Sequence, residues 1–287
     1  RSTLFPYTTL FRSSYTLKVM DGKPLTFRLM DPPLHEFVPQ TEEKQREVAK
    51  ARGLEYEQLH ARIESMHEVN PMMGLRGVRL GIIYPEITEM QFRALFSATV
   101  ELMKEGFNPM LEIMVPLTIN AAELKHQKAL ANRVKDEVEA KYGIKFNYKF
   151  GTMIEIPRAA LVANQIAEVA EFFSFGTNDL TQMTFGFSRD DVNAIVKTYV
   201  DEKIIPADPF NNFDRECVGE LVKIGIERGR STRPELKCGV CGEHGGDPTA
   251  AEFFYKNGMN YVSCSPFRVP VARLAAAQAA IKEAREK

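Results

Sequence analysis

The sequence alternates short apolar segments with longer amphipathic ones, and this alternation leaves few folds open. Apolar strands separated by helices are typical of parallel sheets whose faces are covered by helices. Six strands fit a doubly wound sheet, whereas a (β/α)8 barrel requires eight. The six predicted strands are residues 25–30, 110–116, 149–155, 172–176, 236–241 and 260–264.

The segments between these strands have the apolar spacing of helices. One stretch, residues 187–215, has little periodicity, and we expect it to form an excursion from the core. The predicted helices are residues 41–67, 86–105, 121–142, 158–171, 216–229, 248–256 and 269–287.

The first residues have a foreign character. Residues 3–13 read TLFPYTTLFRS, which resembles the in-frame translation of a common DNA-sequencing adapter, and the chain does not begin with Met. We therefore expect residues 1–13 to be an artefact that does not pack on the domain. Residues 14–287 are then expected to be one domain that is incomplete at its N-terminal end.

Composition excludes several classes of protein. The 37 basic and 38 acidic residues nearly cancel and form no basic stripe, which argues against a nucleic-acid partner. The longest apolar runs are too short to span a bilayer. Four cysteines and no secretory signal predict a reducing cytosol, with an organelle left open because the natural N-terminus is expected to be missing.

Polar residues gather where the predicted strands end. Arg28 lies late in the first strand, Glu155 ends the third, and Thr177-Asn178-Asp179 follows the fourth. Cys241 ends the fifth. Because ligands bind at the carboxyl ends of strands in parallel α/β folds, these residues are expected to share one site.

Two kinds of ligand suit these side chains. Glu155 and Asp179 are candidate ligands of Mg²⁺, which needs only one or two carboxylates, although each could instead cap a helix or pair with an arginine. Arginines suit phosphate and carboxylate groups, and Arg28 is the strongest candidate because an arginine in an apolar strand is costly without an anion. The other candidates are Arg76, Arg79 and Arg189, and for the last two a surface salt bridge is the favoured interpretation.

The Cys238-Gly-Val-Cys241 segment resembles a redox or zinc element only superficially. No second pair of cysteines supplies the remaining zinc ligands, and the segment lies late in the chain on a strand rather than at a helix start. Cys241 is then either a small buried side chain or an acid at a strand end. The sequence contains no glycine-rich phosphate loop for ATP.

Several stretches together resemble the pyruvate, phosphate dikinase family, within the wider group of phosphoenolpyruvate-utilising phosphotransferases. They cover the chain from about residue 24 to its end: Arg28-Leu-Met-Asp-Pro-Pro-Leu-His-Glu-Phe37, Asn70-Pro-Met-Met-Gly-Leu-Arg-Gly77, Gly151-Thr-Met-Ile-Glu-Ile-Pro-Arg158, Phe172-Phe-Ser-Phe-Gly-Thr-Asn-Asp-Leu-Thr-Gln182, Cys238-Gly-Val-Cys-Gly-Glu-His-Gly-Gly246 and Val262-Ser-Cys-Ser-Pro-Phe-Arg268.

The resemblance implies a C-terminal (β/α)8 barrel that binds phosphoenolpyruvate or pyruvate. It implies phosphoryl exchange with a histidine on a separate swivelling domain, ATP chemistry on a third domain, and a homodimer. Glu155 and Asp179 match Mg²⁺ ligands, and Cys241 matches the acid/base at the methyl carbon. The residues that match substrate contacts are Arg28, Arg76, Glu155, Thr177, Asn178, Asp179 and Arg189.

The chain also departs from the family pattern. This sequence has no counterpart of the two strands that precede Arg28 in the family barrel. It also lacks the swivelling histidine and the nucleotide domain. We therefore expect about six of the eight strands, and a parent protein with the full activity. The alternatives are a fragment of phosphoenolpyruvate synthase, another pyruvate-barrel lyase that uses Mg²⁺, or a catalytically inert fragment.

Overall fold

The computed structural model describes the backbone of residues 4–286 and the side chains of residues 12–33 and 36–285. Its centre is one sheet of six parallel strands, in the order β1-β2-β3-β4-β5-β6. The strands are β1 (Pro24–Arg28), β2 (Met110–Val115), β3 (Lys149–Ile154), β4 (Phe172–Gly176), β5 (Lys237–Cys241) and β6 (Tyr261–Val262).

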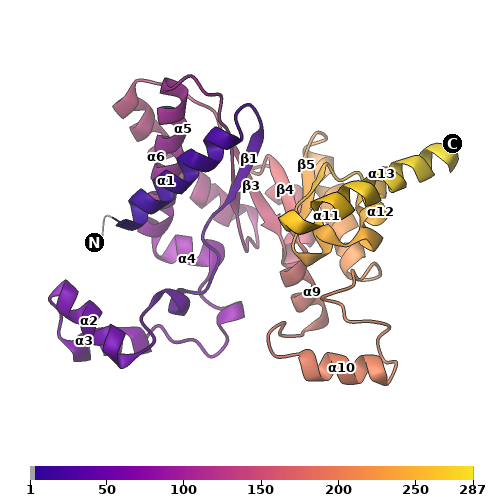
Figure 1. The fold of residues 1–287 in the computed structure, drawn as a ribbon, viewed down its shortest axis with the longest axis horizontal. Coiled ribbons are helices and arrows are strands. Elements are labelled where there is room, and N and C mark those ends of the chain that lie inside the picture. Colours follow the sequence, from indigo (N-terminus) through magenta and orange to yellow (C-terminus); the bar gives the residue numbers. More distant parts are fainter. Residues whose placement is uncertain (1–3, 287) are drawn as a thin grey trace.

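The strand order decides between the two folds that the sequence left open. A doubly wound sheet reverses its order at a switch point, whereas the strands of a barrel follow one another around the axis. Here every strand pairs with the next one along the chain, and the sheet curls into a half-barrel (Figure 1). The described residues thus supply six strands of the eight that a closed (β/α)8 barrel has, and the predicted fold class is confirmed.

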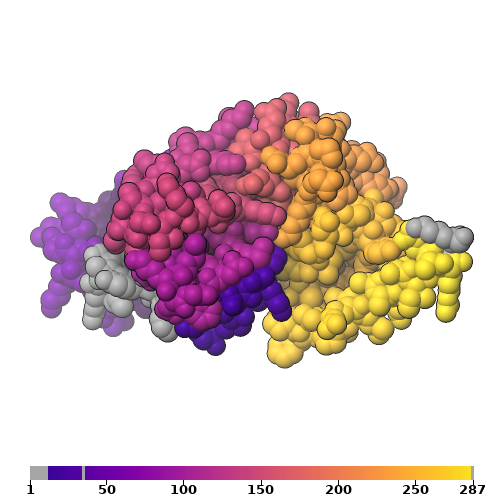
Figure 2. Space-filling view, turned by 90° about the horizontal axis from the view of Figure 1, so that it is seen from above, coloured from indigo at the N-terminus to yellow at the C-terminus, as the bar shows by residue number. Residues whose placement is uncertain are grey.

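Helices cover the outer face of this sheet. Figure 2 shows the molecule from above: early and late parts of the chain, indigo and yellow, lie next to each other along one side, and the middle part lies opposite. The helices of the described residues are α1 (Leu4–Val19), α2 (Glu42–Arg52), α3 (Tyr56–Glu64), α4 (Gly77–Ile83), α5 (Pro85–Lys104), α6 (Ala121–Tyr142), α7 (Pro157–Leu161), α8 (Ala163–Ile166), α9 (Thr177–Phe185), α10 (Asn193–Asp201), α11 (Val218–Thr232), α12 (Pro248–Lys256) and α13 (Val269–Glu286).

Two segments that were predicted as single helices are each divided into two helices, so these predictions are wrong. The segment 41–67 divides into α2 and α3 because Gly53 ends α2 in the left-handed conformation, with a φ of 65°. The segment 158–171 divides into the short helices α7 and α8 at Val162, whose φ and ψ are not helical. Residues 187–215 do leave the core, as predicted, but they contain α10 (Figure 1).

The prediction that residues 1–13 do not pack concerns α1. This helix lies against α5, where Leu17 is buried beside Ala98 and Leu102. Ser13, at the end of the adapter-like segment, is also buried. The side chains of Phe5, Tyr7 and Phe11, on which the prediction depends, lie outside the described residues, so it stays a prediction.

Among residues 4–286, no helix combines the length and the apolar character that a membrane crossing requires.

Candidate functional site

The polar residues singled out in the sequence lie at the carboxyl ends of the strands. Arg28 ends β1, Glu155 follows β3 directly, and Cys241 ends β5. The register pairs Cys241 with Gly176, the last residue of β4, so the thiol lies beside the start of α9. Thr177, Asn178 and Asp179 form the first turn of that helix.

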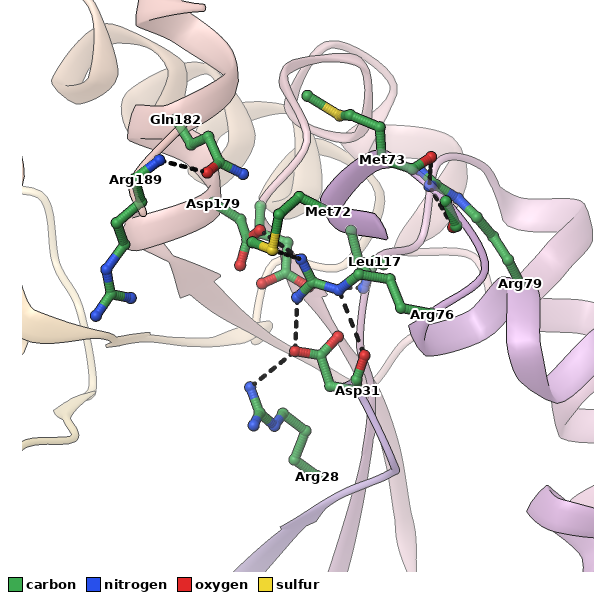
Figure 3. A network of polar contacts seen from close by, with 12 residues as sticks. Arg28, Asp31, Met72, Met73, Arg76, Arg79, Leu117, Asp179, Gln182 and Arg189 are labelled. Atoms are coloured by element: carbon green, nitrogen blue, oxygen red, sulfur yellow. Dashed lines mark hydrogen bonds and ion pairs between the residues drawn. The ribbon is translucent and has the colours of Figure 1, made fainter. Parts of the chain in front are cut away.

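A buried network of charges joins two of these strand ends (Figure 3). Arg76, at the N-cap of α4, is only 4% exposed. Its Nη1 lies 3.0 Å from Asp179 Oδ1, and its Nη2 lies 2.7 Å from Asp31 Oδ2. The same Asp31 oxygen accepts a hydrogen bond of 3.3 Å from Arg28 Nη1. The network therefore links Arg28, Arg76 and Asp179 through Asp31, a residue that the sequence analysis did not single out.

Glu155 is a buried carboxylate with only half of its hydrogen bonds made. Oε1 accepts a bond of 2.6 Å from the amide of Leu117, whose φ of 59° is unusual for a non-glycine residue. Oε2 is buried and has no hydrogen-bond partner. Any side chain at Gly176 would collide with it, because a Cβ there would lie 2.3 Å from Oε2. The glycine that ends β4 thus lets the backbone approach this carboxylate closely.

The surroundings of Glu155 disfavour its charged form. Burial, and then the negative charges of Asp179 and Asp31, raise the pKa of Glu155 to about 8. A cation beside Oε2 would reverse this effect by compensating the three carboxylates. The described residues contain no group of three or more His, Cys, Asp or Glu side chains arranged to hold a metal. Two carboxylates suffice for Mg²⁺, which retains its own waters, so Glu155 and Asp179 fit this ion.

Cys241 faces the inside of the half-barrel, and Cys238 faces outward. Cys241 packs against Met114, Met153 and Phe172 on the inner face, whereas Cys238 is fully buried in the core beneath the helices. The Cys241 thiol donates to the carbonyl oxygen of Phe175 over 3.6 Å. Burial raises the pKa of Cys241 to about 11, although the nearby Ser174 side chain lowers it in part. The thiol is therefore protonated at neutral pH.

Two residues near Cys241 were missed by the sequence analysis. The Ser174 side chain lies near both Cys241 and Tyr261, and it offsets part of the rise in the pKa of each. Burial raises the pKa of Tyr261, so its phenol is also neutral. Ser174 lies two residues before Gly176, and Tyr261 begins β6. Side chains alternate between the two faces of a strand, so the sequence could have placed Ser174 and Tyr261 on the inner face, opposite to their apolar neighbours.

Thr177 and Asn178 hold the loop that follows Cys241. The Thr177 hydroxyl donates to the carbonyl oxygen of Cys241 over 3.2 Å, and Asn178 Oδ1 accepts from the amide of Glu243 over 3.1 Å. Between these contacts Gly242 has a φ of 101°, and a Cβ there would lie 2.9 Å from Thr177 Oγ1. The contacts position Cys241, and they occupy groups that were predicted to contact substrate.

Arg189 and Arg79 lie apart from this network. The amide of Arg189 donates to Gln182 Oε1, and its exposed side chain extends away from Asp31 (Figure 3). Arg79 Nη1 donates to the carbonyl oxygens of Met73 and Gly74. Arg79 therefore fixes the loop before Arg76, in place of the surface salt bridge considered from the sequence.

An open hollow lies at the opposite end of the strands. This open cleft of about 710 Å³ is lined by residues around Phe107, Tyr148 and Lys149, at the amino ends of β1 to β3. None of the candidate residues at the carboxyl ends lines it. We place the site at the carboxyl ends because the unpartnered carboxylate oxygens and the displaced pKa values are found there.

Comparison with known proteins agrees with this geometry. Residues 10–281 match the family model described as "PEP-utilising enzyme, PEP-binding domain". Pyruvate, phosphate dikinase of Clostridium symbiosum is 56% identical over 272 residues, which are 94% of this chain and 31% of that protein. Pyruvate, phosphate dikinase 2 of Zea mays is 58% identical over 263 residues, 91% of this chain and 30% of that protein.

A third relative shows the same proportions. Pyruvate, phosphate dikinase of Rickettsia prowazekii is 52% identical over 267 residues, which are 93% of this chain and 30% of that protein. The chain thus spans less than a third of the length of these relatives. By its family match and these identities, the chain belongs to the PEP-utilising enzymes and carries their PEP-binding domain.

Proposed function

We propose that this chain is the phosphoenolpyruvate- and pyruvate-binding part of a pyruvate, phosphate dikinase. The parent enzyme would interconvert ATP, phosphate and pyruvate with AMP, diphosphate and phosphoenolpyruvate. The observation that carries the proposal is Glu155, a buried carboxylate with an unpartnered oxygen, beside Asp179 and the thiol of Cys241. The dikinases compared above, each of which matches more than nine-tenths of the chain, favour this enzyme over phosphoenolpyruvate synthase or a lyase.

In this proposal Glu155 and Asp179 hold Mg²⁺. The ion would supply positive charge that stabilises the enolate left when the phosphoryl group departs. The protein prepares the position by leaving Glu155 Oε2 without a hydrogen-bond donor. Arg76, which pairs with Asp179 at 3.0 Å, balances part of the carboxylate charge.

The remaining residues bind the substrate and move a proton. Arg28 uses one of its N–H groups on Asp31, and its half-exposed side chain has others for phosphate or carboxylate oxygens. Asn178 and Arg189 are proposed as further contacts to these anions. Cys241, neutral at pH 7, gives its proton to the methylene carbon of the enolate and becomes a thiolate. In the reverse direction the thiolate takes a proton from the methyl carbon of pyruvate and becomes the thiol again. Met114, Met153 and Phe172 pack against the partly exposed thiol on the inner face.

The proposal also assigns partners. A phosphohistidine on a swivelling domain of the parent protein would deliver the phosphoryl group to the open carboxyl end of the half-barrel, and ATP would react elsewhere. We propose a homodimer, with no nucleic-acid or membrane partner, in the cytoplasm. An organelle is the alternative, because several related plant dikinases carry the word chloroplastic in their names.

Proton exchange at pyruvate tests the proposal on the 287-residue chain. The chain is incubated with pyruvate and Mg²⁺ in D₂O, and loss of the methyl proton signal is followed by NMR. We expect exchange above the protein-free rate, and we expect EDTA to abolish it. Exchange no faster than in buffer would show that the chain is the inert fragment considered from the sequence.

A further inference from the structure

Asp31 is a buried carboxylate that lies between two arginines of the candidate site. It lies three residues after Arg28, where the chain leaves β1, and it is 6% exposed. A carboxylate this deeply buried is costly unless charged partners compensate it. Its Oδ2 accepts from two arginines, while its Oδ1 has no partner.

The two arginines that meet on Asp31 are used differently. Arg76 has all three of its nitrogens engaged: Nε donates to the Asp31 carbonyl oxygen over 3.3 Å, Nη2 to Asp31 Oδ2 over 2.7 Å, and Nη1 to Asp179 Oδ1 over 3.0 Å. Arg28 makes one bond, of 3.3 Å, and 48% of its side chain is exposed. Figure 3 shows Asp31 between them.

This difference separates the roles of the two arginines. Each nitrogen of the planar Arg76 guanidinium already donates to an oxygen of its own chain, and the side chain is only 4% exposed, so Arg76 is far less accessible to a substrate anion than Arg28. Arg28 is restrained at one edge by Asp31, and its other N–H groups remain for a ligand. An arginine restrained in this way loses less conformational entropy when it binds.

We propose that Asp31 is a positioning residue of the substrate site. It orients Arg28 toward the substrate anion, and it holds Arg76 as an internal counter-charge that keeps Asp179 in place. The proposal deepens the proposed function and rests on it for the identity of the anion. The arrangement of Arg76 is a property of the free protein and can be measured without any ligand.

The ligand-free test is the rotation of the Arg76 guanidinium about its Nε–Cζ bond. Rotation requires the bonds of Nη1 to Asp179 and of Nη2 to Asp31 to break together. In the wild-type chain we expect slow rotation and two separate Nη signals by ¹⁵N NMR. In Asp31→Asn, a variant of the same shape without the charge, we expect rotation about tenfold faster or more, because a charge-assisted hydrogen bond is weakened.

The ligand test uses oxalate, a planar dianion of the size of pyruvate enolate, titrated calorimetrically in the presence of Mg²⁺. We expect Asp31→Asn to weaken its binding about tenfold or more, because Arg28 loses its restraint. The matched control is Glu137→Gln, which removes a carboxylate from the exposed ion pairs with Arg93 and Arg133. This control should bind oxalate as the wild type does.

The outcomes are separable. Unchanged rotation and unchanged oxalate affinity in a folded Asp31→Asn chain would overturn the positioning role. Should that variant not fold, a single averaged Nη signal for Arg76 in the wild type would overturn it equally. Absence of oxalate binding to the wild-type chain would count against the proposed function, and the rotation of Arg76 would still decide the role of Asp31.

Discussion

The two faces of the curled sheet follow different rules, and Cys238 and Cys241 show this most directly. The outer face, beneath the helices, is a continuous apolar core that includes Cys238, Val240 and Phe173. The inner face carries Glu112, Lys237, Ser174 and the strand-end residues of the site, with only a small apolar cluster between them.

Each face limits substitution for its own reason. On the outer face a side chain is acceptable if it fills its volume, because packing dominates there. On the inner face charges and hydroxyls are buried in pairs, so each residue is needed by a particular partner. Cys238 and Cys241 have the same side chain on one strand and therefore compare the two faces without a change of chemistry.

The largest expected effect is on proton exchange at pyruvate. Cys241→Ala should slow the methyl exchange of the 287-residue chain by about 10² to 10⁴-fold, the usual contribution of a general acid or base. Cys238→Ala, three residues away on the opposite face, is the control and should leave the rate nearly unchanged. Equal losses in both variants, measured by NMR in D₂O, would remove Cys241 from the mechanism and break the comparison.

The ionisation of Cys241 should have the next largest effect. Burial raises its pKa to about 11, so the neutral thiol predominates below that value and the reactive thiolate increases about tenfold per pH unit up to it. At pH 8 we expect iodoacetamide to alkylate Cys241 about a thousandfold more slowly than a fully ionised thiolate would react. Exposed Cys217 serves as the internal reference in mass spectrometry. Labelling of Cys241 at the rate of Cys217 would contradict the raised pKa.

The charges of the inner face should be sensitive to the loss of one partner. Lys237 Nζ lies 2.9 and 2.8 Å from the two carboxylate oxygens of Glu112, which is 3% exposed. Lys237→Met should lower the free energy of unfolding by about 3 kcal/mol, because it leaves the Glu112 charge with the Thr26 hydroxyl alone.

The corresponding double variant sharpens this test. Replacing both partners, as Glu112→Leu with Lys237→Met, should recover most of the loss, since no uncompensated charge remains buried. Urea denaturation of the two variants measures the difference. A double variant as unstable as Lys237→Met alone would mean that shape, rather than charge, governs this part of the inner face.

The smallest expected effect lies on the outer face. Cys238 is fully buried, so Cys238→Ala should cost about 1 kcal/mol of unfolding free energy through lost packing. The exposed Cys217→Ala should change it by less than about 0.5 kcal/mol. Both values come from the same urea titrations. If Cys238→Ala lowered the unfolding free energy as much as Lys237→Met, the two faces would not differ in the way that we propose.

The strands and most helices followed from local pattern. Apolar runs such as Phe172–Gly176 and the amphipathic repeat of Pro85–Lys104 were predictable because their spacing reports directly which face is buried. The breaks at Gly53 and Val162 were not, because a helix-prone composition continues through both of them. The excursion at residues 187–215 was expected from its weak periodicity, but α10 within it was not.

The candidate site divides in a similar way. Arg28, Glu155, Asp179 and Cys241 could be located from their places at strand ends, where a parallel α/β fold gathers its ligand-binding side chains. The sequence also contained every member of the inner-face pairs, but nothing in it indicated that Asp31 would meet Arg76, or Ser174 meet Tyr261, across long separations.

Those pairings depend on how strongly the sheet curls and on the course of the loops between its strands. Periodicity along a chain specifies the face on which a residue lies, since it reflects burial repeated every two or 3.6 residues. Partners on a shared face are selected by distances in space between segments that sequence spacing does not relate. For this reason the parallel strands and the polar residues at their carboxyl ends could be predicted from the sequence. The ion pairs of Arg76 with Asp31 and Asp179 became apparent only in the folded structure.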